Sequence, residues 1–329
     1  MKLLHNPSTD PHYNMAFDEY CLQSLPLDEP LCYFWRNRPA VIVGVSQNVY
    51  AEVNLDYLTQ RGIVLARRMT GGGAVYHDLQ NLNYTIVGRS ADFETDYAGY
   101  MQYVVDALRA LGVPASANGR NDILVDGMKV SGYAKRVWHD RLMVHGTLLY
   151  DVDLPVLTQV LSVPGSKMQA LGVASVRSRV ANLKSYLPDD IRSIEALQTA
   201  MERLLSHDFH DGEMYLSEKE EAEVQSLADS KFATWQWNYG RSPRLGTVRS
   251  RKLPCGTVEV HLTVERGVIT ALRFGGDFLG NRPADGLADM LQGCRYEAAA
   301  LRERLAEAGV AQYFDGVDAA VLTDLLLNG

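Results

Sequence analysis

Cysteine is scarce in this sequence, and its scarcity argues against two kinds of architecture. Among 329 residues there are 4 cysteines, Cys21, Cys32, Cys255 and Cys294, which are widely separated and form no Cys-x-x-Cys pair. A disulfide framework and a cysteine-ligated zinc site both require more closely spaced cysteines. We therefore expect neither, and a reducing cytoplasm is the simpler location.

Positive charge and long apolar runs are also in short supply. Lys and Arg number 32 against 40 Asp and Glu, a formal net charge of -8, and a surface of this sign repels a phosphate backbone. The first residues turn polar at His5, too early for a secretory signal, and no later apolar run is long enough to cross a bilayer. The sequence predicts a cytoplasmic protein that binds neither nucleic acid nor membranes.

The rest of the composition is that of a globular protein. Hydrophobic residues make up 47% and charged residues 22%, fractions typical of soluble domains, and the length favours about two domains. The pattern changes after a connector that contains Ser242-Pro243, where clean apolar alternation follows. We predict a catalytic domain over residues 1–244 and a small accessory domain over residues 245–329.

Short apolar strands and amphipathic helices are interspersed in the first domain. Asn14 is the expected cap of its first helix, and apolar periodicity predicts helices over residues 15–25, 97–111, 154–161, 194–205 and 217–232. Apolar runs predict strands over residues 32–35, 40–44, 63–66, 83–87 and 142–150. This irregular order favours an α+β fold with a mixed or antiparallel sheet over a doubly wound Rossmann fold.

The second domain has an equally simple pattern. Apolar residues alternate over residues 258–264 and again over 268–274, on either side of a turn at Arg266-Gly267. Helices are expected over residues 283–291, 296–308 and 317–327. The accessory domain should therefore be a small α+β unit.

A tight hairpin is predicted around Asp126-Gly127. A two-residue Asp-Gly loop suits such a turn because both central residues need positive φ. Strand alternation would then place Lys129 and Ser131 on one face, with Met128 and Val130 on the other.

Three consecutive glycines, Gly71–Gly73, form a candidate anion-binding loop between two strands. Without β-carbons, backbone N–H groups can surround an anion, and Arg67 and Arg68 just before the loop carry guanidinium groups that match phosphate oxygens. Alternation suggests that only one of the two arginines faces the site. The spacing matches neither a P-loop nor a dinucleotide-binding motif, and an isolated glycine triplet is often only a flexible turn.

Lys129 is the candidate catalytic residue, although most strand lysines are simply exposed. The small residues Ser131 and Gly132 follow it and leave room for a ligand, while Asn121 and Asp122 upstream can orient a metal, an amine or the lysine. A positive charge here would neutralise a carboxylate that attacks a phosphate.

Two further groups of histidines are weaker candidates. His145 has only small neighbours to cover it and is a secondary site residue, although a single strand histidine more often has a packing role. His207 and His210 have a metal-like spacing, but one short polar stretch rarely builds a zinc site.

These segments resemble the lipoate–protein ligase A family. The glycine loop resembles its Arg-Arg-x-x-Gly-Gly-Gly-Ala-Val-[Phe/Tyr]-His-Asp signature, and further family-like segments follow in the same order: residues 119–122, 129–132, 145–149, 175–183 and 235–240. The resemblance implies a catalytic domain of the class II aminoacyl-tRNA synthetase and biotin ligase type, with a mixed, largely antiparallel sheet. It departs from the family at Val45, where an arginine is usual.

The resemblance also implies a role for each matching residue. Lys129 would touch both the ATP phosphate and the lipoate carboxylate, and Arg68 would contact phosphate. Asn121 and Asp122 would help to hold the nucleotide, and Asp122 would bind its Mg²⁺. The remaining binding residues would be Gly71, Gly72, Gly73, Ala74, Val75, Tyr76, His77, Ser131, Gly132 and His145.

The implied activity is ATP-dependent lipoylation by a monomer. Lipoate would be activated to lipoyl-AMP and transferred to a lysine on a lipoyl domain of a 2-oxoacid dehydrogenase E2 subunit or on the glycine cleavage H protein. A cysteine-dependent octanoyl or lipoyl transferase of the same fold and a catalytically silent homologue remain alternatives. The first needs a cysteine in the site, and none lies between Cys32 and Cys255. Biotin ligase is less favoured because its glycine–arginine loop is absent.

Overall fold

The computed structural model describes the chain except for residues 119–120, 162–179, 207–213, 242–246, 266 and 329. The chain divides into two compact units. The first unit comprises Met1–Ile42, Val53–Ala66 and Val75–Thr234, and the second comprises Val43–Glu52, Arg67–Ala74 and Trp235–Gly329. The predicted boundary between residues 244 and 245 lies outside the described residues and stays a prediction.

A sheet of seven described strands organises the first unit, in the order β1-β2-β6-β10-β9-β8-β7. β1 and β2 are parallel, and the other neighbours are antiparallel. The sheet is therefore mixed and largely antiparallel, as predicted. Its strands are β1 (Lys2–Leu3), β2 (Leu31–Trp35), β6 (Asn81–Arg89), β7 (Ser116–Ala117), β8 (Asp122–Val125), β9 (Met128–Trp138) and β10 (Arg141–Leu149).

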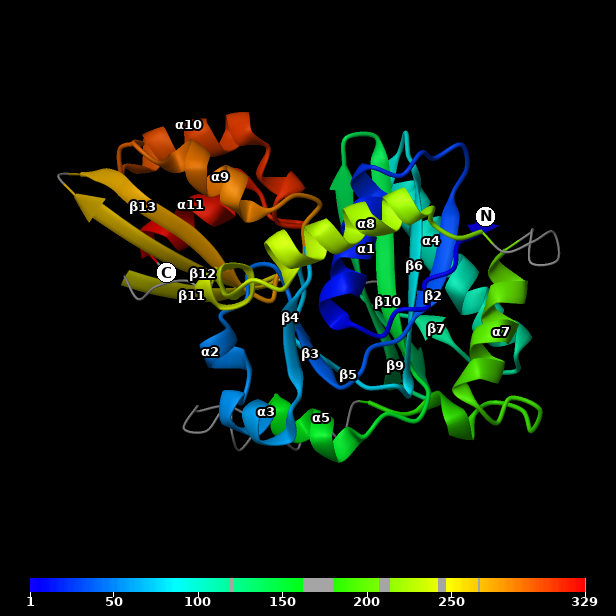
Figure 1. The fold of residues 1–329 in the computed structure, drawn as a ribbon. Helices are drawn as coiled ribbons and strands as arrows, with labels where there is room; N and C mark the ends of the chain where they lie inside the picture. The colour runs from blue at the N-terminus through cyan, green and yellow to red at the C-terminus, as the bar shows by residue number, and fades with distance from the viewer. Residues whose placement is uncertain (119–120, 162–179, 207–213, 242–246, 266, 329) are drawn as a thin grey trace. The chain divides into compact units, whose positions relative to one another are not determined.

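Helices cover both faces of this sheet, and Figure 1 shows α1 beside α8. Alternate residues of β6, Leu82, Tyr84 and Ile86, join α4 and α7 in one apolar core. Thr85, between them, instead bonds to Asp18 of α1, so α1 covers the opposite, more polar face. The helices of this unit are α1 (Pro11–Gln23), α3 (Leu55–Arg61), α4 (Phe93–Ala110), α5 (Leu154–Val160), η1 (Leu183–Ser185), α7 (Ile194–Leu205), α8 (Glu218–Leu227) and the π-helix η2 (Ala228–Phe232).

The first helix begins earlier than the sequence pattern predicted. Asp10 caps α1 by accepting bonds from the backbone N–H groups of His12 and Tyr13, and Pro11 occupies the first turn. Pro at this position has the φ that a helix needs and no N–H to lose. The prediction of Asn14 as the cap was wrong. Asn14 lies within the helix, and its buried side chain donates from Nδ2 to Asn37 Oδ1 at 2.8 Å.

A small sheet in the order β4-β3-β5 flanks the glycine triplet, which therefore lies between strands as predicted. Its strands are β3 (Ala40–Val43), β4 (Val64–Arg67) and β5 (Val75–His77). Val43 and Arg67, at the ends of β3 and β4, already belong to the second unit. The backbone N–H of Arg68 donates to Val43 O at 3.0 Å, which anchors the start of the loop.

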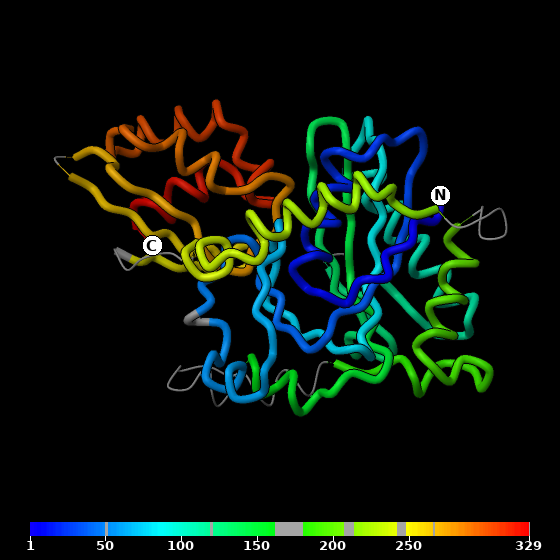
Figure 2. The backbone as a smooth tube through the Cα atoms, in the orientation of Figure 1, coloured from blue at the N-terminus to red at the C-terminus, as the bar shows by residue number. Residues whose placement is uncertain are grey.

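The second unit is built on a meander of three strands in the order β11-β12-β13, followed along the backbone in Figure 2. Apolar residues from β12, β13 and three helices form its own core. The predicted β12–β13 pair and the helices are confirmed, whereas β11 was missed. The elements are α2 (Val49–Glu52), the π-helix η3 (Gln236–Gly240), β11 (Thr247–Leu253), β12 (Gly256–Glu265), β13 (Val268–Gly276), α9 (Ala284–Leu291), α10 (Ala298–Ala308), η4 (Val310–Gln312) and α11 (Ala319–Asn328).

No helix in the described part of the chain has the length and apolar character needed to cross a bilayer.

Candidate functional site

Arg68 holds the glycine loop of the second unit in shape. Its Nη2 donates to Gly71 O at 2.6 Å and to Gly73 O at 2.8 Å, and its Nε donates to Thr70 Oγ1 at 3.1 Å. The side chain is 7% exposed, and burial lowers the pKa of the guanidinium. This arginine therefore organises the loop through its own carbonyl groups. Its predicted contact with phosphate stays a prediction.

Close packing or backbone conformation requires glycine at Gly71 and Gly72 of the loop and at the nearby Gly44. A β-carbon on Gly71 would lie 2.4 Å from Phe278 O, and one on Gly44 would lie 2.2 Å from Gly72 O. Gly72 has a φ of +86° and donates its N–H to Phe278 O at 3.1 Å. A β-carbon on Gly73 meets nothing within 4 Å. Only Gly73 has the open surroundings that the sequence reasoning assigned to the whole triplet.

Arg67 has a different role from Arg68, because its side chain is fully buried among backbone carbonyls. It donates to Gly44 O, Val45 O and Gln47 O from Nη1, to Trp237 O from Nε and to Asn238 O from Nη2, at 2.8 to 3.1 Å. Burial lowers its pKa. Both arginines are buried, so the expectation that one of them faces a ligand stays a prediction.

The family-atypical residue Val45 also lies in this region. Its side chain is 7% exposed, and its backbone N–H donates to Thr70 O at 2.9 Å. Position 45 therefore makes main-chain contacts with the start of the glycine loop and no ionic contact.

Two acidic residues of the second unit act on a third, Glu52, at the end of α2. Burial, followed by the charges of Asp277 and Glu259, raises the pKa of Glu52 to about 7. The Asp277 carboxylate accepts the backbone N–H of Thr257 at 2.5 Å. The Glu52 carboxyl group therefore has a pKa near neutral pH.

In the first unit Lys129 forms an ion pair with Asp122. Nζ lies 2.7 Å from Oδ1, and the two side chains are 30% and 23% exposed. Asn118 donates to the other carboxylate oxygen at 3.3 Å, and Ala181 N–H donates to Lys129 O at 2.9 Å. The structure thus brings together two predicted site residues, and the carboxylate orients the lysine.

The prediction that Lys129 and Ser131 share a face of β9 was wrong because the hairpin contains a β-bulge. Ser131 pairs with Ile123 and Lys129 pairs with Leu124, so Val130 is an extra residue without a partner across the strand. A bulge re-aims the side chains that follow it. The Lys129 ammonium consequently lies against Gly132, the residue that pairs with Asp122 across the hairpin. Ser131 is on the other face and is fully buried. The turn itself is as predicted, with φ of +51° at Asp126 and +76° at Gly127.

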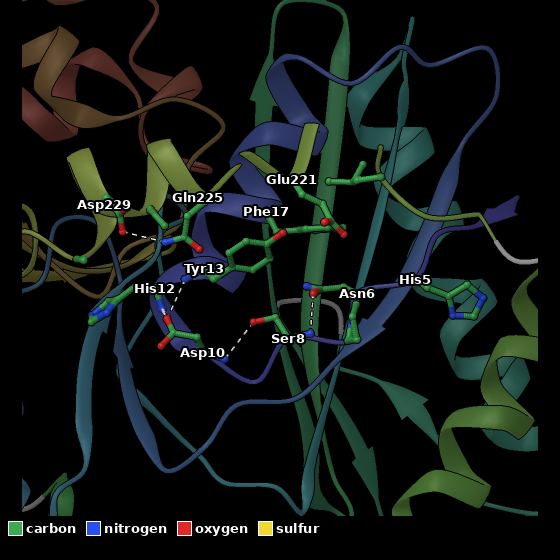
Figure 3. A pocket seen from close by; sticks show the side chains of 14 residues that line it. His5, Asn6, Ser8, Asp10, His12, Tyr13, Phe17, Glu221, Gln225 and Asp229 are labelled. Carbon is green, nitrogen blue, oxygen red and sulfur yellow. Dashed lines mark hydrogen bonds between the residues drawn. The ribbon is translucent and has the colours of Figure 1, made fainter. Parts of the chain in front are cut away.

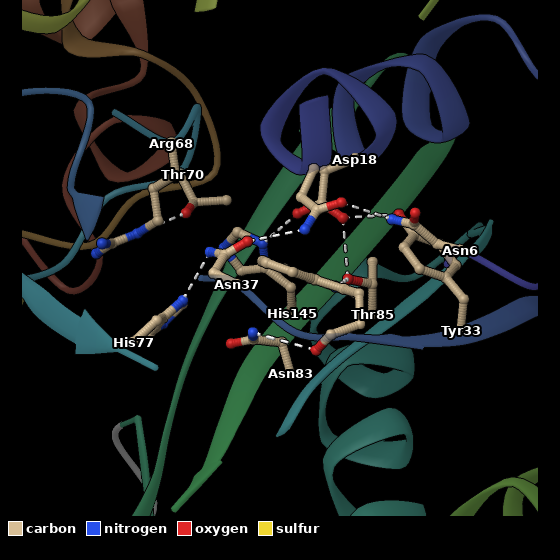
Figure 4. Close-up of polar contacts among 12 residues, drawn as sticks. Asn6, Asp18, Tyr33, Asn37, Arg68, Thr70, His77, Asn83, Thr85 and His145 are labelled. Carbon is tan, nitrogen blue, oxygen red and sulfur yellow. Dashed lines mark hydrogen bonds and ion pairs between the residues drawn. The ribbon is translucent and has the colours of Figure 1, made fainter. Parts of the chain in front are cut away.

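A buried polar network lies between α1 and the sheet, and Figure 4 shows it around Asp18. One carboxylate oxygen of Asp18 is 2.7 Å from His145 Nδ1, and the other accepts from Tyr33 Oη at 2.7 Å and Thr85 Oγ1 at 3.0 Å. Burial raises the pKa of Tyr33 well above its usual range. His145 is therefore held in one orientation by a carboxylate.

Sequence reasoning missed Asp18. Acidic residues inside a predicted amphipathic helix, here Asp18 and Glu19, usually mark the solvated face, so the burial of Asp18 at 1% exposure gave no local signal. The nearest available clue was Asn14, four residues earlier on the same helix and equally polar at a buried position.

Four other predicted residues lie in β5 or directly before β8. His77 Nδ1 is 3.0 Å from Asn37 Nδ2, and burial raises the pKa of Tyr76. Val75 pairs with Ile42 across β3. The backbone of Asn121 accepts a bond from Tyr133 N–H at 2.9 Å, so its main chain fixes the strand that carries Lys129.

The first unit also has a separate hollow of about 550 Å³ between its first residues, α1 and α8 (Figure 3). Polar groups such as His12, Tyr13 and Glu221 line it. None of the predicted site residues does. This hollow is therefore distinct from the Lys129–Asp122 pair.

The two cysteines of the first unit are buried, and the described residues contain no metal-binding cluster. Cys21 and Cys32 are fully or almost fully buried, and burial raises the pKa of Cys21 well above its usual range, which makes a poor nucleophile. No group of three or more acidic, histidine or cysteine side chains is placed to hold a metal within the described ranges. The weak zinc candidate at His207 and His210 falls outside them.

Two family descriptions match the chain. The lipoyl protein ligase A/B catalytic domain matches residues 10–206, and the bacterial lipoate protein ligase C-terminus matches residues 242–326. The chain belongs to the lipoate–protein ligase family. The protein is therefore a ligase, and the resemblance predicted from the sequence is confirmed.

Two bacterial relatives match along nearly the whole chain. Lipoate-protein ligase LplJ of Bacillus subtilis (strain 168) is 35% identical over 324 residues, 96% of this chain and 97% of that protein. Lipoate–protein ligase 1 of Staphylococcus aureus (strain Mu50 / ATCC 700699) is 36% identical over 328 residues, 99% of this chain and all of that protein (100%).

Three solved structures confirm the predicted α+β fold class. P. falciparum LipL1 in complex with lipoate has a TM-score of 0.79 at 21% identity, covering 100% of this chain and 99% of that one. A bipartite ligase from Thermoplasma acidophilum has a TM-score of 0.66 at 34% identity and covers 74% of this chain and 98% of that one. A lipoate-protein ligase A bound with ATP has a TM-score of 0.63 at 33% identity, covering 73% and 98%.

Proposed function

We propose that this enzyme uses ATP to activate lipoate and then transfers the lipoyl group to a lysine of a lipoyl domain. The Lys129–Asp122 pair carries this proposal, since it is a half-buried ammonium held at 2.7 Å from a carboxylate in the segment that resembles the family's catalytic-lysine motif. The ATP-bound and lipoate-bound relatives support both substrates. The acceptor is proposed from the T. acidophilum ligase, which is described together with its E2 lipoyl domain.

In the first half-reaction the lipoate carboxylate attacks the α-phosphate of ATP, and pyrophosphate leaves. Lys129 neutralises the charge that gathers between the two anions, an electrostatic effect that is strong in a partly desolvated site. Arg68 and the backbone from Gly73 to Tyr76 would hold the phosphates, while His77, Asn121 and His145 would line the substrate site.

In the second half-reaction the acceptor lysine attacks the carbonyl of the mixed anhydride, and AMP leaves as the new amide forms. Lys129 would then hydrogen-bond to the developing oxyanion. Both steps depend on positioning and charge neutralisation. No covalent bond to the enzyme forms, which fits the burial of Cys21 and Cys32.

Magnesium would enter with the nucleotide. In nucleotide sites Mg²⁺ is usually held by one or two carboxylates together with substrate phosphates, and Asp122 is a single carboxylate beside Lys129. It fits that pattern and would help to neutralise the phosphates. The acceptor would be an E2 lipoyl domain or the glycine cleavage H protein, with the reaction in the cytoplasm.

Lipoate-dependent exchange of pyrophosphate into ATP tests the proposal directly. Wild-type protein should catalyse exchange with lipoate and not with biotin, and Lys129→Ala should lower the rate by at least about 100-fold. Lys219→Ala removes a lysine that is 86% exposed and should have no effect. ATP-independent lipoyl transfer that is lost on changing a cysteine would refute the proposal and favour the transferase, and failure to bind lipoate or ATP would leave a silent homologue.

A further inference from the structure

Within the described residues, the part of β9 that contains Lys129 is not paired with the neighbouring strand β10. β9 pairs with β10 from Trp138 as far as Tyr133, which lies opposite Gly146. The next residue, Gly132, donates its N–H to the side-chain Oγ1 of Thr147 at 3.1 Å. The threonine hydroxyl thus continues the attachment where the backbone ladder between the two strands has ended.

The other edge of the same segment contains the bulge. Gly132 lies opposite Asp122, and the extra residue Val130 turns Lys129 toward the same face. The backbone of Lys129 is also held from outside, by Ala181 N–H at 2.9 Å. Asp122, Lys129 and Gly132 consequently share one face of the hairpin.

Gly132 provides the space in which the ammonium group lies. A β-carbon at this position would be 2.7 Å from Lys129 Nζ and 2.9 Å from its Cε, and 3.9 Å from Asp122 Oδ1. Real β-carbons do not approach other atoms within 3.0 Å. The absence of a side chain at position 132 therefore accommodates the lysine itself, whereas the sequence reasoning assigned this room to the ligand.

We propose that Gly132, supported by the Thr147 hydroxyl, is a positioning residue that sets where the Lys129 ammonium meets the reacting groups. This inference rests on the proposed ligase function. Because the crowded atoms are the flexible end of a lysine, Gly132→Ala would displace the ammonium from Asp122 and leave the fold intact. Displacement of a catalytic group by about 1 Å can cost about 100-fold in rate.

Kinetics of the full-length protein test this role. Gly132→Ala should lower kcat of lipoate-dependent exchange by about 10- to 100-fold with KM for ATP little changed, which is typical of a group that acts mainly in the transition state. Gly99→Ala is the matched control, since a β-carbon on this α4 glycine meets nothing within 4 Å. Thr147→Val should reproduce part of the loss, and Thr147→Ser should restore it.

A double substitution separates positioning from a general structural effect. Once Lys129→Ala has removed the ammonium, adding Gly132→Ala should change the residual rate by less than about twofold, because the two residues act through one group. Full multiplication of the two losses would overturn the inference. Unchanged kcat in Gly132→Ala, in an enzyme whose exchange depends on Lys129, would overturn it as well.

Chemical labelling gives a readout that does not depend on the reaction. Lys129 in Gly132→Ala should react with acetic anhydride at least about twofold faster than in wild type, because the ammonium loses the carboxylate partner that favours its unreactive charged form. Equal labelling of Lys129 in the two proteins would overturn the inference even if the wild type shows no exchange. Absence of exchange in wild type, with faster labelling of the variant, would refute only the proposed function.

Discussion

Removal of the Arg67 guanidinium should destabilise the second unit more than any other single change in the glycine loop. The side chain is fully buried and donates five hydrogen bonds to carbonyls of two chain segments, Gly44 to Gln47 and Trp237 to Asn238. Hydrogen bonds to charged groups contribute about 1.5–3 kcal/mol each, so five would give an upper bound of roughly 7–15 kcal/mol. Desolvation of the guanidinium offsets part of this. We expect Arg67→Met to cost about 3–5 kcal/mol, the range for breaking a buried charged interaction.

Arg67→Lys keeps the charge but has three N–H donors and cannot serve all five carbonyls. It should lose less than Arg67→Met, about 2 kcal/mol, on the same scale. Urea unfolding followed by tryptophan fluorescence is a suitable assay, since Trp237 donates to Arg67 O at 2.8 Å and reports on this region. A loss below about 1 kcal/mol for Arg67→Met would refute the reasoning, because buried carbonyls would then tolerate the loss of every donor.

Four other substitutions test the remaining groups. Gly73→Ala should weaken ATP binding by roughly tenfold in calorimetry without changing stability, whereas Gly44→Ala should reduce both, since its β-carbon would meet backbone. Glu52 has a folded-state pKa near 7, above its usual 4.5, so stability should fall as pH rises through that interval. Glu52→Gln should remove this loss, up to about 3 kcal/mol at pH 8, as measured by urea midpoints at pH 5 and 8. Asp18→Asn should cost about 1–3 kcal/mol and loosen the His145 ring, measured by unfolding and imidazole NMR.

The elements that were predicted well are those whose signal is local. The Asp-Gly turn fixes its own backbone angles, and alternating apolar residues in β12 and β13 leave few other arrangements. β11 was missed because its sequence, with Arg249, Arg251 and Lys252, lacks apolar alternation. Its basic side chains find partners far along the chain, such as Asp324 for Arg251.

The sequence names candidate site residues, but their arrangement could not be predicted from it. Neither the bulge at Val130 nor the contacts of Arg67 with residues 237–238 can be read from nearby sequence, because each depends on a partner segment. Strand alternation alone put Lys129 on the face of Ser131. The buried Asp18–His145 pair joins residues 127 positions apart and has no sequence pattern at all.

Most glycines of the candidate site make room for other atoms of the protein and not for a ligand. At Gly44, Gly71 and Gly132 the β-carbon position is crowded by the chain's own atoms, two carbonyl oxygens and one ammonium group. Gly73 alone among these four has open space beside it. Substitution at the first three therefore changes the shape of the enzyme or the position of Lys129, and only substitution at Gly73 probes the ligand without an intervening protein contact.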